Sequence, residues 1–571
     1  MDKSVNIAIL GNCTTDFLTQ ALKNECKKHS ISARVYNCPY NQYNQEILNK
    51  ESEFYRSKPE LSILFLEGKL LFPEWYEFNS LIEGSKNKIS LIDSVFDSLT
   101  LILENIHSNN NTNIIINNFK IPYYSPLGIL DGNYFPGLKD MVAMLNLKLD
   151  EWSADKDYIY IFDYSGLSAQ FGNAKAEDPK MYYIAKNTMS FQFMNVLARE
   201  YMRYILPLKF MSKKCLVLDL DNTLWGGLAG EDGMSGISLD ISGKGKSFYD
   251  FQKEIINLYN KGIILAVNSK NNVEDAMSII NNHPHMLLRE HHFSSLKINW
   301  NDKFSNIKEI SKDLNISTDS MVFFDDSPVE RELIKSMLPE VKVVEVPADT
   351  SRYADTLKNI VEFEFLKITD EDIKRNLMYK GNQKRIELRQ QFKNIDDYLA
   401  SLKIKVVIEY ANKFSIPRIA QLTQKTNQFN MTTKRYSQTD IENMVKSENY
   451  FVLSCQVLDK FGDNGISGVC IIKMENTCAY FDTFLLSCRV LGRNVEYAYI
   501  HKIISLLRGK SIDHIYALFI RTEKNKANEK FYAQAGFTKS LSDEKEIIYS
   551  LESINELKSI KYIEMIMNEG E

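Results

Sequence analysis

The sequence lacks the features typical of membrane proteins, disulfide-stabilised secreted proteins and nucleic-acid-binding proteins. No apolar stretch among its 571 residues is long enough to cross a bilayer, and the run Val5–Leu10 lacks the length and cleavage site of a secretion signal. The eight cysteines form no Cys-x-x-Cys pair, which suits reduced thiols rather than a disulfide framework or a zinc site. The formal net charge is -5 and the basic residues are scattered, so the sequence predicts no strong positive potential that would attract nucleic acid. We therefore expect a cytoplasmic protein whose partners are neither membranes nor nucleic acids.

Apolar residues are plentiful enough to fill several cores. They make up 44% of the chain, and its length predicts three or four domains. Short apolar runs alternate with helical patterns, which predicts α/β domains with parallel sheets. The predicted strands of the first two blocks are Asn6–Leu10, Leu61–Phe65, Ile114–Ile116, Tyr158–Phe162, Cys215–Leu220, Ile263–Asn268, Met321–Phe324 and Val341–Val346.

The third block differs because it contains a hairpin pattern. Two apolar runs, Phe451–Leu458 and Ile466–Met474, flank Asn464-Gly465, a dipeptide that favours a tight hairpin turn. The predicted domains are residues 1–206, 213–365 and 403–552, with a connecting helical segment at 366–402 and a C-terminal tail at 553–571.

The strongest chemical pattern lies at the end of the first strand of the central block. Apolar residues run into Asp219 and Asp221, one residue apart. Ligands bind open α/β sheets at the carboxyl ends of the strands, so both carboxylates are expected in a binding site. Two neighbouring carboxylates raise each other's pKa or require a cation, and Mg²⁺ prefers such hard oxygen ligands. Acidic residues that merely end a strand are the alternative explanation of this motif.

Three companion motifs favour a catalytic site. Ser269 follows the next strand and could bond a phosphoryl oxygen, and Lys303 could offset the clustered negative charge. Asp325 and Asp326 end a further strand and supply two more hard ligands. We expect Mg²⁺ to be bound by Asp219, Asp221, Asp325 and Asp326.

The order Asp, Ser, Lys, Asp resembles the four motifs of the haloacid dehalogenase superfamily across the whole central block. The resemblance implies that Asp219 is a nucleophile that attacks phosphorus and that Asp221 acts as acid and base. It gives the remaining catalytic roles to Ser269 and Lys303. The glycine-rich segment from Trp225 to Gly233 suits a flap over such a site.

The third block resembles the GNAT acetyltransferase fold. A strand runs into Arg489 and Gly492, which match a pyrophosphate-binding loop, although Asn494 replaces its last small residue. Asn528 and Tyr532 match the later part of the pattern, where the tyrosine is the usual general acid; a buried core tyrosine is the rival explanation. The resemblance implies CoA, or the phosphopantetheine of a carrier protein, as a cofactor. The amide-rich segment Gln421–Asn430 is either a solvated helix end or a ligand-facing segment.

The first block resembles the SGNH hydrolase fold with altered catalytic positions. Cys13 stands where that fold has its serine, and Asp178 begins the later motif without the histidine that should follow. A cysteine without a base is more often a small buried residue than a nucleophile. We expect a catalytically degenerate domain that serves for recognition or docking.

The three blocks together resemble the FkbH-like family, on the motif Asp219–Gly227 and on stretches such as Asp325–Glu332 and Asp482–Gly492. The resemblance implies an enzyme that dephosphorylates an acyl phosphate of the 1,3-bisphosphoglycerate type and loads a glyceryl unit onto an acyl carrier protein for polyketide-type biosynthesis. Similar proteins often carry a cysteine where this chain has Asn268. Two alternatives stay open: a small-molecule phosphatase fused to a GNAT-type N-acetyltransferase, and a non-catalytic scaffold that docks carrier proteins.

Overall fold

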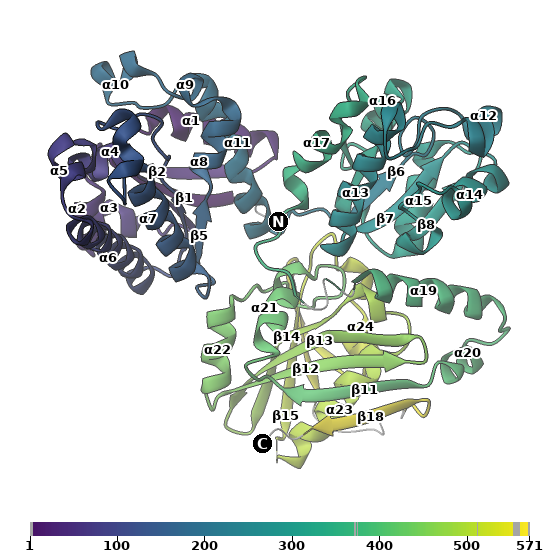
Figure 1. Ribbon diagram of the computed structural model, residues 1–571. Helices are drawn as coiled ribbons and strands as arrows, with labels where there is room; N and C mark the ends of the chain where they lie inside the picture. Colours follow the sequence, from purple (N-terminus) through teal and green to yellow (C-terminus); the bar gives the residue numbers. More distant parts are fainter. Residues whose placement is uncertain (1–3, 370–372, 374, 511, 552–559, 569–571) are drawn as a thin grey trace. The chain divides into compact units, whose positions relative to one another are not determined.

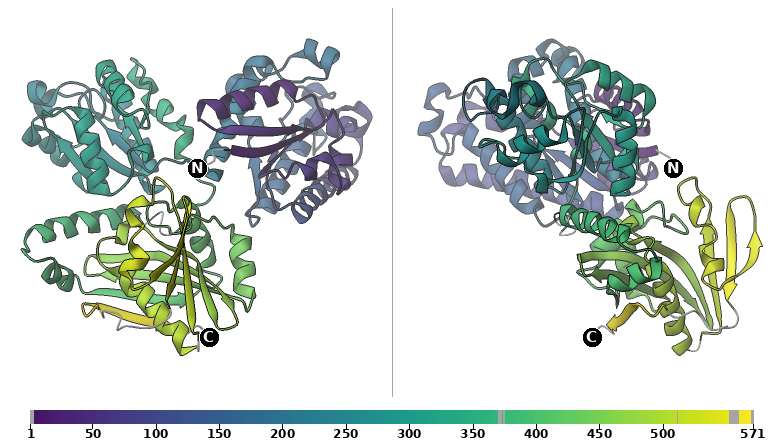
Figure 2. Two further views of the ribbon diagram at one scale, coloured as in Figure 1. Left: turned by 180° about the vertical axis from the view of Figure 1, so that it is seen from behind. Right: turned by 90° about the vertical axis from the view of Figure 1, so that its right-hand side faces the viewer.

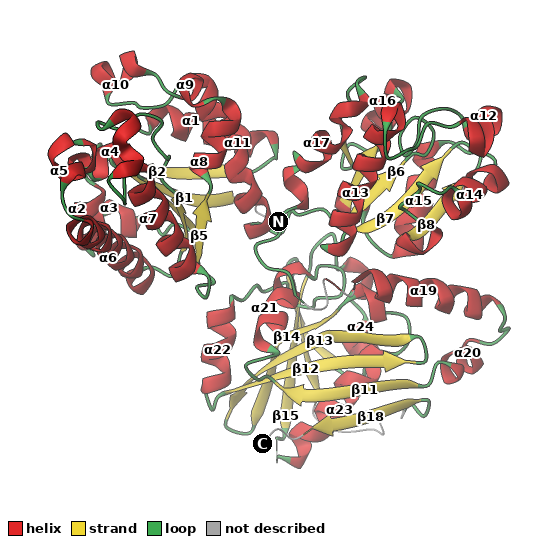
Figure 3. Cartoon of the chain, in the orientation of Figure 1, coloured by secondary structure: helices red, strands yellow, loops and turns green. Residues whose placement is uncertain are grey.

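The computed structural model describes residues 4–369, 373, 375–510, 512–551 and 560–568, and it divides into two compact units, Met1–Lys209 and Phe210–Glu571 (Figure 1). The first unit is a five-stranded parallel sheet in the order β2-β1-β3-β4-β5. The strands are β1 (Ser4–Gly11), β2 (Ser32–Asn37), β3 (Leu61–Phe65), β4 (Asn113–Asn117) and β5 (Ile159–Phe162). Every residue of β3 is buried, as expected for a central strand whose two faces are both covered by helices (Figure 3).

Helices cover both faces of this sheet. α1 (Asp16–Lys28) packs against α11 (Phe191–Leu208), and α6 (Ser85–Asn109) packs against α7 (Leu138–Ser153) (Figure 1). The shorter helices of the unit are α2 (Tyr43–Leu48), α3 (Glu53–Arg56), α4 (Gly68–Leu71), α5 (Phe78–Ile82), α8 (Tyr164–Phe171), α9 (Asn173–Ala176) and α10 (Pro179–Ala185), with 3-10 turns η1 (Pro73–Tyr76) and η2 (Gly128–Asn133).

The second unit opens with another five-stranded parallel sheet, in the order β10-β9-β6-β7-β8. Its strands are β6 (Cys215–Leu218), β7 (Ile264–Ser269), β8 (Phe293–Ile298), β9 (Met321–Phe324) and β10 (Lys342–Val343). The helices are α12 (Ala229–Gly236), α13 (Lys246–Asn260), α14 (Val273–Asn282), α15 (Lys303–Leu314), α16 (Pro328–Met337) and α17 (Tyr353–Lys358). Short 3-10 turns are η3 (Gly243–Gly245), η4 (Glu290–His292), η5 (Thr318–Ser320), η6 (Thr350–Arg352) and η7 (Val361–Phe363). β6 lies at the centre of this sheet, between β9 and β7, which places its carboxyl end beside theirs.

The rest of the second unit is an eight-stranded mixed sheet that twists along its length (Figure 2). Its strands, in the order β16-β17-β15-β14-β13-β12-β11-β18, have the bounds β11 (Ile404–Tyr410), β12 (Tyr450–Asp459), β13 (Gly462–Glu475), β14 (Cys478–Leu486), β15 (His514–Ile520), β16 (Thr538–Ser542), β17 (Glu546–Leu551) and β18 (Ile563–Asn568). The helices are α19 (Arg375–Gln390), α20 (Ile395–Ser401), α21 (Ile416–Lys425), α22 (Gln438–Lys446), α23 (Val495–Gly509) and α24 (Phe531–Gln534), with 3-10 turns η8 (Cys488–Val490) and η9 (Lys526–Asn528). α21 and α22 cover one face of this sheet and α23 covers the other. The three α/β sheets confirm the predicted fold class.

Two details of this sheet differ from the expectations. β12 ends at Asp459 and β13 begins at Gly462, so the hairpin turns before Asn464-Gly465, which lies inside β13. Gly465 has a φ of 64° at a place where the pairing register shifts, so the dipeptide forms an irregularity within the strand pair instead of its turn. Within the expected C-terminal tail, β18 pairs in parallel with β11 and completes the edge of the sheet.

Candidate active site

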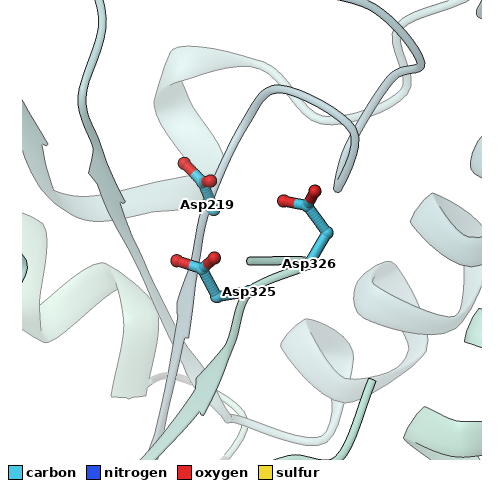
Figure 4. A group of neighbouring side chains, drawn as sticks. All are labelled: Asp219, Asp325 and Asp326. Atoms are coloured by element: carbon cyan, nitrogen blue, oxygen red, sulfur yellow. The ribbon is translucent and has the colours of Figure 1, made fainter. Parts of the chain in front are cut away.

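The candidate site is built where β6 and β9 end side by side. Leu218 pairs with Phe324, so Asp219 and Asp325 are the first residues beyond two neighbouring strands (Figure 4). The N–H of Asp219 donates a hydrogen bond to the carbonyl of Phe324 at 3.1 Å, which fixes this register up to the site. Carboxylates of Asp219, Asp325 and Asp326 offer one oxygen each within 4.8 Å of one another.

Lys303, the first residue of α15, provides the cation of the cluster. Its ammonium lies 2.8 Å from Asp219 Oδ2 and 2.6 Å from Asp325 Oδ2, and the lysine side chain is 3% exposed. Burial alone would lower the pKa of Lys303, but the two carboxylates raise it above its usual range, so the side chain stays charged.

The two carboxylates that follow β9 experience both burial and repulsion by Asp219. Burial, followed by the charge of Asp219, raises the pKa of Asp325 to about 7 and also raises the pKa of Asp326. One ammonium cannot neutralise three carboxylates, so the cluster has the charge balance of a site that accepts a divalent cation.

The two oxygens of the Asp219 carboxylate show whether a divalent cation fits this site. Its Oδ1 is buried and has no hydrogen-bond partner among the described residues, whereas Oδ2 is held by Lys303. Buried polar atoms are rarely left unpaired, and a carboxylate oxygen in this state is a natural ligand for a hard cation or a contact for a phosphoryl group. The donor set of three carboxylates is therefore suited to Mg²⁺.

The loop after β9 is held from two sides. Arg331 donates to the carbonyls of Asp325 at 2.8 Å and of Asp326 at 2.7 Å. Thr223 is fully buried, and its Oγ1 lies 3.3 Å from the N–H of Asp326, which donates to it. The functional assignment from sequence did not include Arg331, although its place in the first turn of α16, directly after the acidic pair, is a usable signal.

Asp221 is the predicted metal ligand that the structure does not bring into the cluster. Its Oδ1 accepts hydrogen bonds from Trp225 Nε1 at 2.9 Å and from the N–H of Ala229 at 3.0 Å, and its Oδ2 accepts from Asn271 at 3.0 Å. Both oxygens of the Asp221 carboxylate thus accept hydrogen bonds, from the flap and from the loop after β7. Burial raises the pKa of Asp221. Among the described residues, the metal-binding group comprises only Asp219, Asp325 and Asp326.

Ser269 and Asn268 end β7, beside β6. Ser269 is buried at the same edge of the sheet as Asp219, where its hydroxyl was expected to meet a phosphoryl oxygen. The Asn268 side chain is fully buried and donates to the carbonyl of Lys303 at 2.8 Å, while its Oδ1 accepts from Asn306 at 3.0 Å. Asn306 also donates to Asn299 at 3.0 Å. This network of amides, which the sequence did not reveal, holds the first turn of the helix that carries Lys303.

Two of the predicted cofactor residues of the C-terminal sheet, Arg489 and Tyr532, are buried. Arg489 is 8% exposed and contacts Ser487 and the sulfur of Met378, and Gly492 has a φ of 75°. Tyr532 is fully buried, and its hydroxyl has no hydrogen-bond partner in the described part of the chain. This burial favours the core-tyrosine explanation over a general acid.

A segment of the chain itself lies where β14 and β15 diverge. In residues 429–431, the N–H of Met431 donates to Phe484 at 3.0 Å and its carbonyl accepts from Ile520 at 2.8 Å. The fully buried Asn525 donates to a carbonyl of the same segment at 3.0 Å, and Asn528 donates to the carbonyl of Gln428 at 2.7 Å. The amide-rich segment thus ends in a buried backbone insertion, and Asn528 serves to hold it.

Of the altered catalytic positions of the first unit, Cys13 is buried and Asp178 caps a helix. Cys13 is 2% exposed, and burial followed by the charge of Glu67 raises the pKa of its thiol, which opposes a reactive thiolate. Asp178 caps α10 by accepting a hydrogen bond from the N–H of Met181 at 3.0 Å.

Comparisons with known proteins identify two of the three blocks. Residues 6–205 match the family profile described as FkbH, N-terminal domain, and residues 214–342 match the profile described as NLI interacting factor-like phosphatase. No curated protein matches the sequence. No helix in the described part of the chain is long and apolar enough to cross a membrane.

Among solved structures, the N-terminal part of the protein BF1531 from Bacteroides fragilis, containing a phosphatase domain complexed with Mg, is 29% identical with a TM-score of 0.59. The match covers 64% of this chain and 95% of that one. The ribosomal-protein-S18-alanine N-acetyltransferase from Escherichia coli is 14% identical over 26% of this chain and 96% of that one, with a TM-score of 0.22. The chain therefore combines a segment that matches the FkbH N-terminal domain with a following segment that matches a phosphatase profile.

Proposed function

We propose that the chain is a magnesium-dependent phosphatase that removes a phosphoryl group from a small substrate through Asp219. One observation carries this proposal: Lys303 anchors Asp219 Oδ2, while Oδ1 stays buried and without a hydrogen-bond partner among the described residues, beside two further carboxylates. A carboxylate held by one oxygen and free at the other is oriented to attack phosphorus.

Each residue of the site has a separate role in phosphoryl transfer. Asp219 attacks phosphorus and carries the phosphoryl group as an aspartyl phosphate, while the ammonium of Lys303 stabilises the negative charge that develops. Asp221 protonates the leaving oxygen and then activates the water that releases phosphate. Mg²⁺, when held by Asp219, Asp325 and Asp326, would neutralise charge on the phosphoryl oxygens. Ser269 binds the transferred group.

The finer proposal is that the substrate is an acyl phosphate of the 1,3-bisphosphoglycerate type and that a glyceryl unit passes to an acyl carrier protein in polyketide-type biosynthesis. The FkbH N-terminal domain supports it. The amide of Asn268 is fixed between Lys303 and Asn306, so the side chain at this position forms no thioester. We therefore propose that Asp219 removes the phosphate ester of the substrate, and that the carrier's thiol loses its proton, attacks the acyl carbonyl and displaces the second phosphate. A glyceryl thioester then forms without an acyl-enzyme at this position.

Two measurements test these proposals. Phosphate release from p-nitrophenyl phosphate and acetyl phosphate is followed with and without Mg²⁺ for the wild type, for Asp219→Asn and for the control Asp240→Asn, an exposed aspartate outside the acidic group. The proposal requires release by the wild type and the control and none by Asp219→Asn; turnover by Asp219→Asn would refute the nucleophile.

Intact-protein mass spectrometry with Mg²⁺, 1,3-bisphosphoglycerate and a phosphopantetheinylated carrier protein tests the second step. A glyceryl adduct on the carrier supports transfer. Phosphate release without an adduct supports a plain phosphatase, and neither product supports a docking scaffold. N-acetyl transfer by the C-terminal sheet is not favoured, because Tyr532 is fully buried and residues 429–431 lie between β14 and β15.

A further inference from the structure

An open pocket lies beside the loop that leads from the catalytic aspartates into the flap. Its volume is about 560 Å³, within the range of about 300–1,000 Å³ that small-molecule sites occupy. Its walls come from that loop, from the start of α13 and from η6, and they include Gly226, Gly227, Ser238, Lys244, Ser247 and Thr350.

Both sides of the pocket are connected to the catalytic loop by direct contacts. The N–H of Gly227 donates to Asn222 Oδ1 at 3.0 Å, and the same loop supplies the donors that hold Asp221. On the other side, Tyr353 packs edge-on against the lining residue Phe248 at 6.1 Å and donates to the carbonyl of Asn222 at 3.3 Å. The pocket is therefore suited to receive the part of a substrate that extends away from Asp219.

The chemistry of the lining favours an anion. Lys244 is its only charged side chain, and four hydroxyl groups, of Ser238, Ser247, Thr350 and Ser351, complete its polar surface. The ammonium of Lys244 is exposed and has no carboxylate partner within the described ranges.

Two carboxylates close to the pocket already accept hydrogen bonds, and one of them, Asp349, also accepts from the hydroxyl of the lining residue Ser351 at 2.7 Å. Asp232 accepts from the N–H of Leu228 at 2.8 Å and Asp349 from the N–H of Ser351 at 3.0 Å, and neither aspartate lines the pocket.

Three other cations near the catalytic residues are already committed. Lys303 is shared by two carboxylates, and Lys270 is paired with Glu330 at 2.7 Å. Arg331 donates to backbone carbonyls. A second anionic group on the substrate would therefore pair with the ammonium of Lys244.

We propose that this pocket binds the non-reacting end of the substrate and that Lys244 selects small phosphorylated compounds that carry a second anionic group, a carboxylate or a phosphate. The inference rests on the proposed phosphatase function, which it extends from the phosphoryl group to the rest of the substrate.

The test compares two phosphate esters that differ only in the second charge: 3-phosphoglycerate, with a carboxylate, and glycerol 3-phosphate, with a hydroxymethyl group in its place. We expect the wild type to have a KM for 3-phosphoglycerate lower by about tenfold, the value of one charge-assisted hydrogen bond. Lys244→Gln removes this preference, while kcat for p-nitrophenyl phosphate is unchanged because that substrate has no second anion.

The matched control is Lys253→Gln, a lysine of α13 that is paired with Asp250 and does not line the pocket. A wild type without preference, or a preference that survives in Lys244→Gln, would overturn the assignment of the pocket while leaving the phosphatase in place. Calorimetry measures the contribution of Lys244 to binding without turnover. The affinity for 3-phosphoglycerate is compared between the Asp219→Asn variant and the double variant Asp219→Asn/Lys244→Gln. If the wild type hydrolyses neither acetyl phosphate nor any of the three esters, the proposed function fails. Equal binding of 3-phosphoglycerate by these two variants would overturn the assignment of the pocket separately.

Discussion

The ammonium nitrogen of Lys303 lies 2.8 Å from Oδ2 of Asp219, and both side chains are almost completely buried. The pair therefore combines two roles, because the lysine both orients the attacking carboxylate and compensates a charge that would be costly to bury alone. Loss of the lysine should consequently affect catalysis and stability together.

The first prediction concerns Lys303→Met. The loss of the positioned charge is expected to lower kcat by roughly 10²–10³, the usual effect of removing one electrostatic stabiliser. The carboxylates left without their partner should also reduce the free energy of unfolding by about 3–5 kcal/mol at neutral pH. Phosphate release and chemical denaturation measure the two effects. Lys312→Met, an exposed position on the same helix, should change neither; wild-type turnover in Lys303→Met would contradict the assigned role.

Magnesium should stabilise the folded protein through the three carboxylates. A ligand present at 100 times its Kd adds about 2.7 kcal/mol to the free energy of unfolding. We expect Mg²⁺ to raise the melting temperature of the wild type and a chelator to reverse the rise. The shift should be much smaller in Asp326→Asn and preserved in Asp240→Asn. An equal shift in wild type and Asp326→Asn would show that the ion binds elsewhere.

Asn268 is predicted to act through the helix that carries Lys303. Asn268→Leu leaves the amide of Asn306 without one acceptor, and a buried polar group without its partner costs about 1–3 kcal/mol. Because the Lys303 turn also loses a contact, kcat for p-nitrophenyl phosphate should fall, and Asn268→Asp, which keeps an acceptor for Asn306, should recover part of it.

The control for this position is Asn281→Leu, which alters an exposed asparagine of α14. If Asn268→Leu loses stability but keeps the wild-type kcat, the amide network serves the fold alone.

A buried ion network should make the C-terminal sheet sensitive to a single substitution. Asp459 is paired with Arg385 at 2.7 Å and with Arg493 at 3.0 Å, and its side chain is 0% exposed. Asp459→Ala leaves two buried guanidinium groups without their anion and should cost about 3–5 kcal/mol, measured by denaturant unfolding. Glu475→Gln, at the exposed end of β13, is the control. A loss below 1 kcal/mol, roughly the value of a surface pair, would contradict this account.

The grouping of the site residues could be predicted because each motif follows a buried apolar strand of one parallel sheet. Adjacent parallel strands end at one edge of a sheet, so the sequence alone predicts that Asp219 and Asp325 lie together. The direction of each side chain could not be predicted in the same way. Asp221 is only two residues further along the loop, yet its carboxylate accepts hydrogen bonds from Trp225 and Ala229 and does not belong to the metal-binding group.

The elements that were missed lack an apolar signal or depend on distant partners. β2 lies at the edge of its sheet, and none of its residues is fully buried, so its sequence Ser-Ala-Arg-Val-Tyr-Asn does not read as a core strand. Residues 429–431 pair with strands far along the chain, and the amide of Asn268 finds its partners in α15. Local periodicity carries no information about such contacts.

The pairing of β18 with β11 has a practical consequence for work with this protein. The last strand of the described chain protects the hydrogen-bonding groups of β11, which would otherwise form an open border over seven residues. A chain that ends at Leu551 would lack β18, and the exposed edge of β11 could then pair with another copy of the protein. Truncated versions made to isolate the phosphatase chemistry should therefore remove the whole C-terminal sheet or none of it.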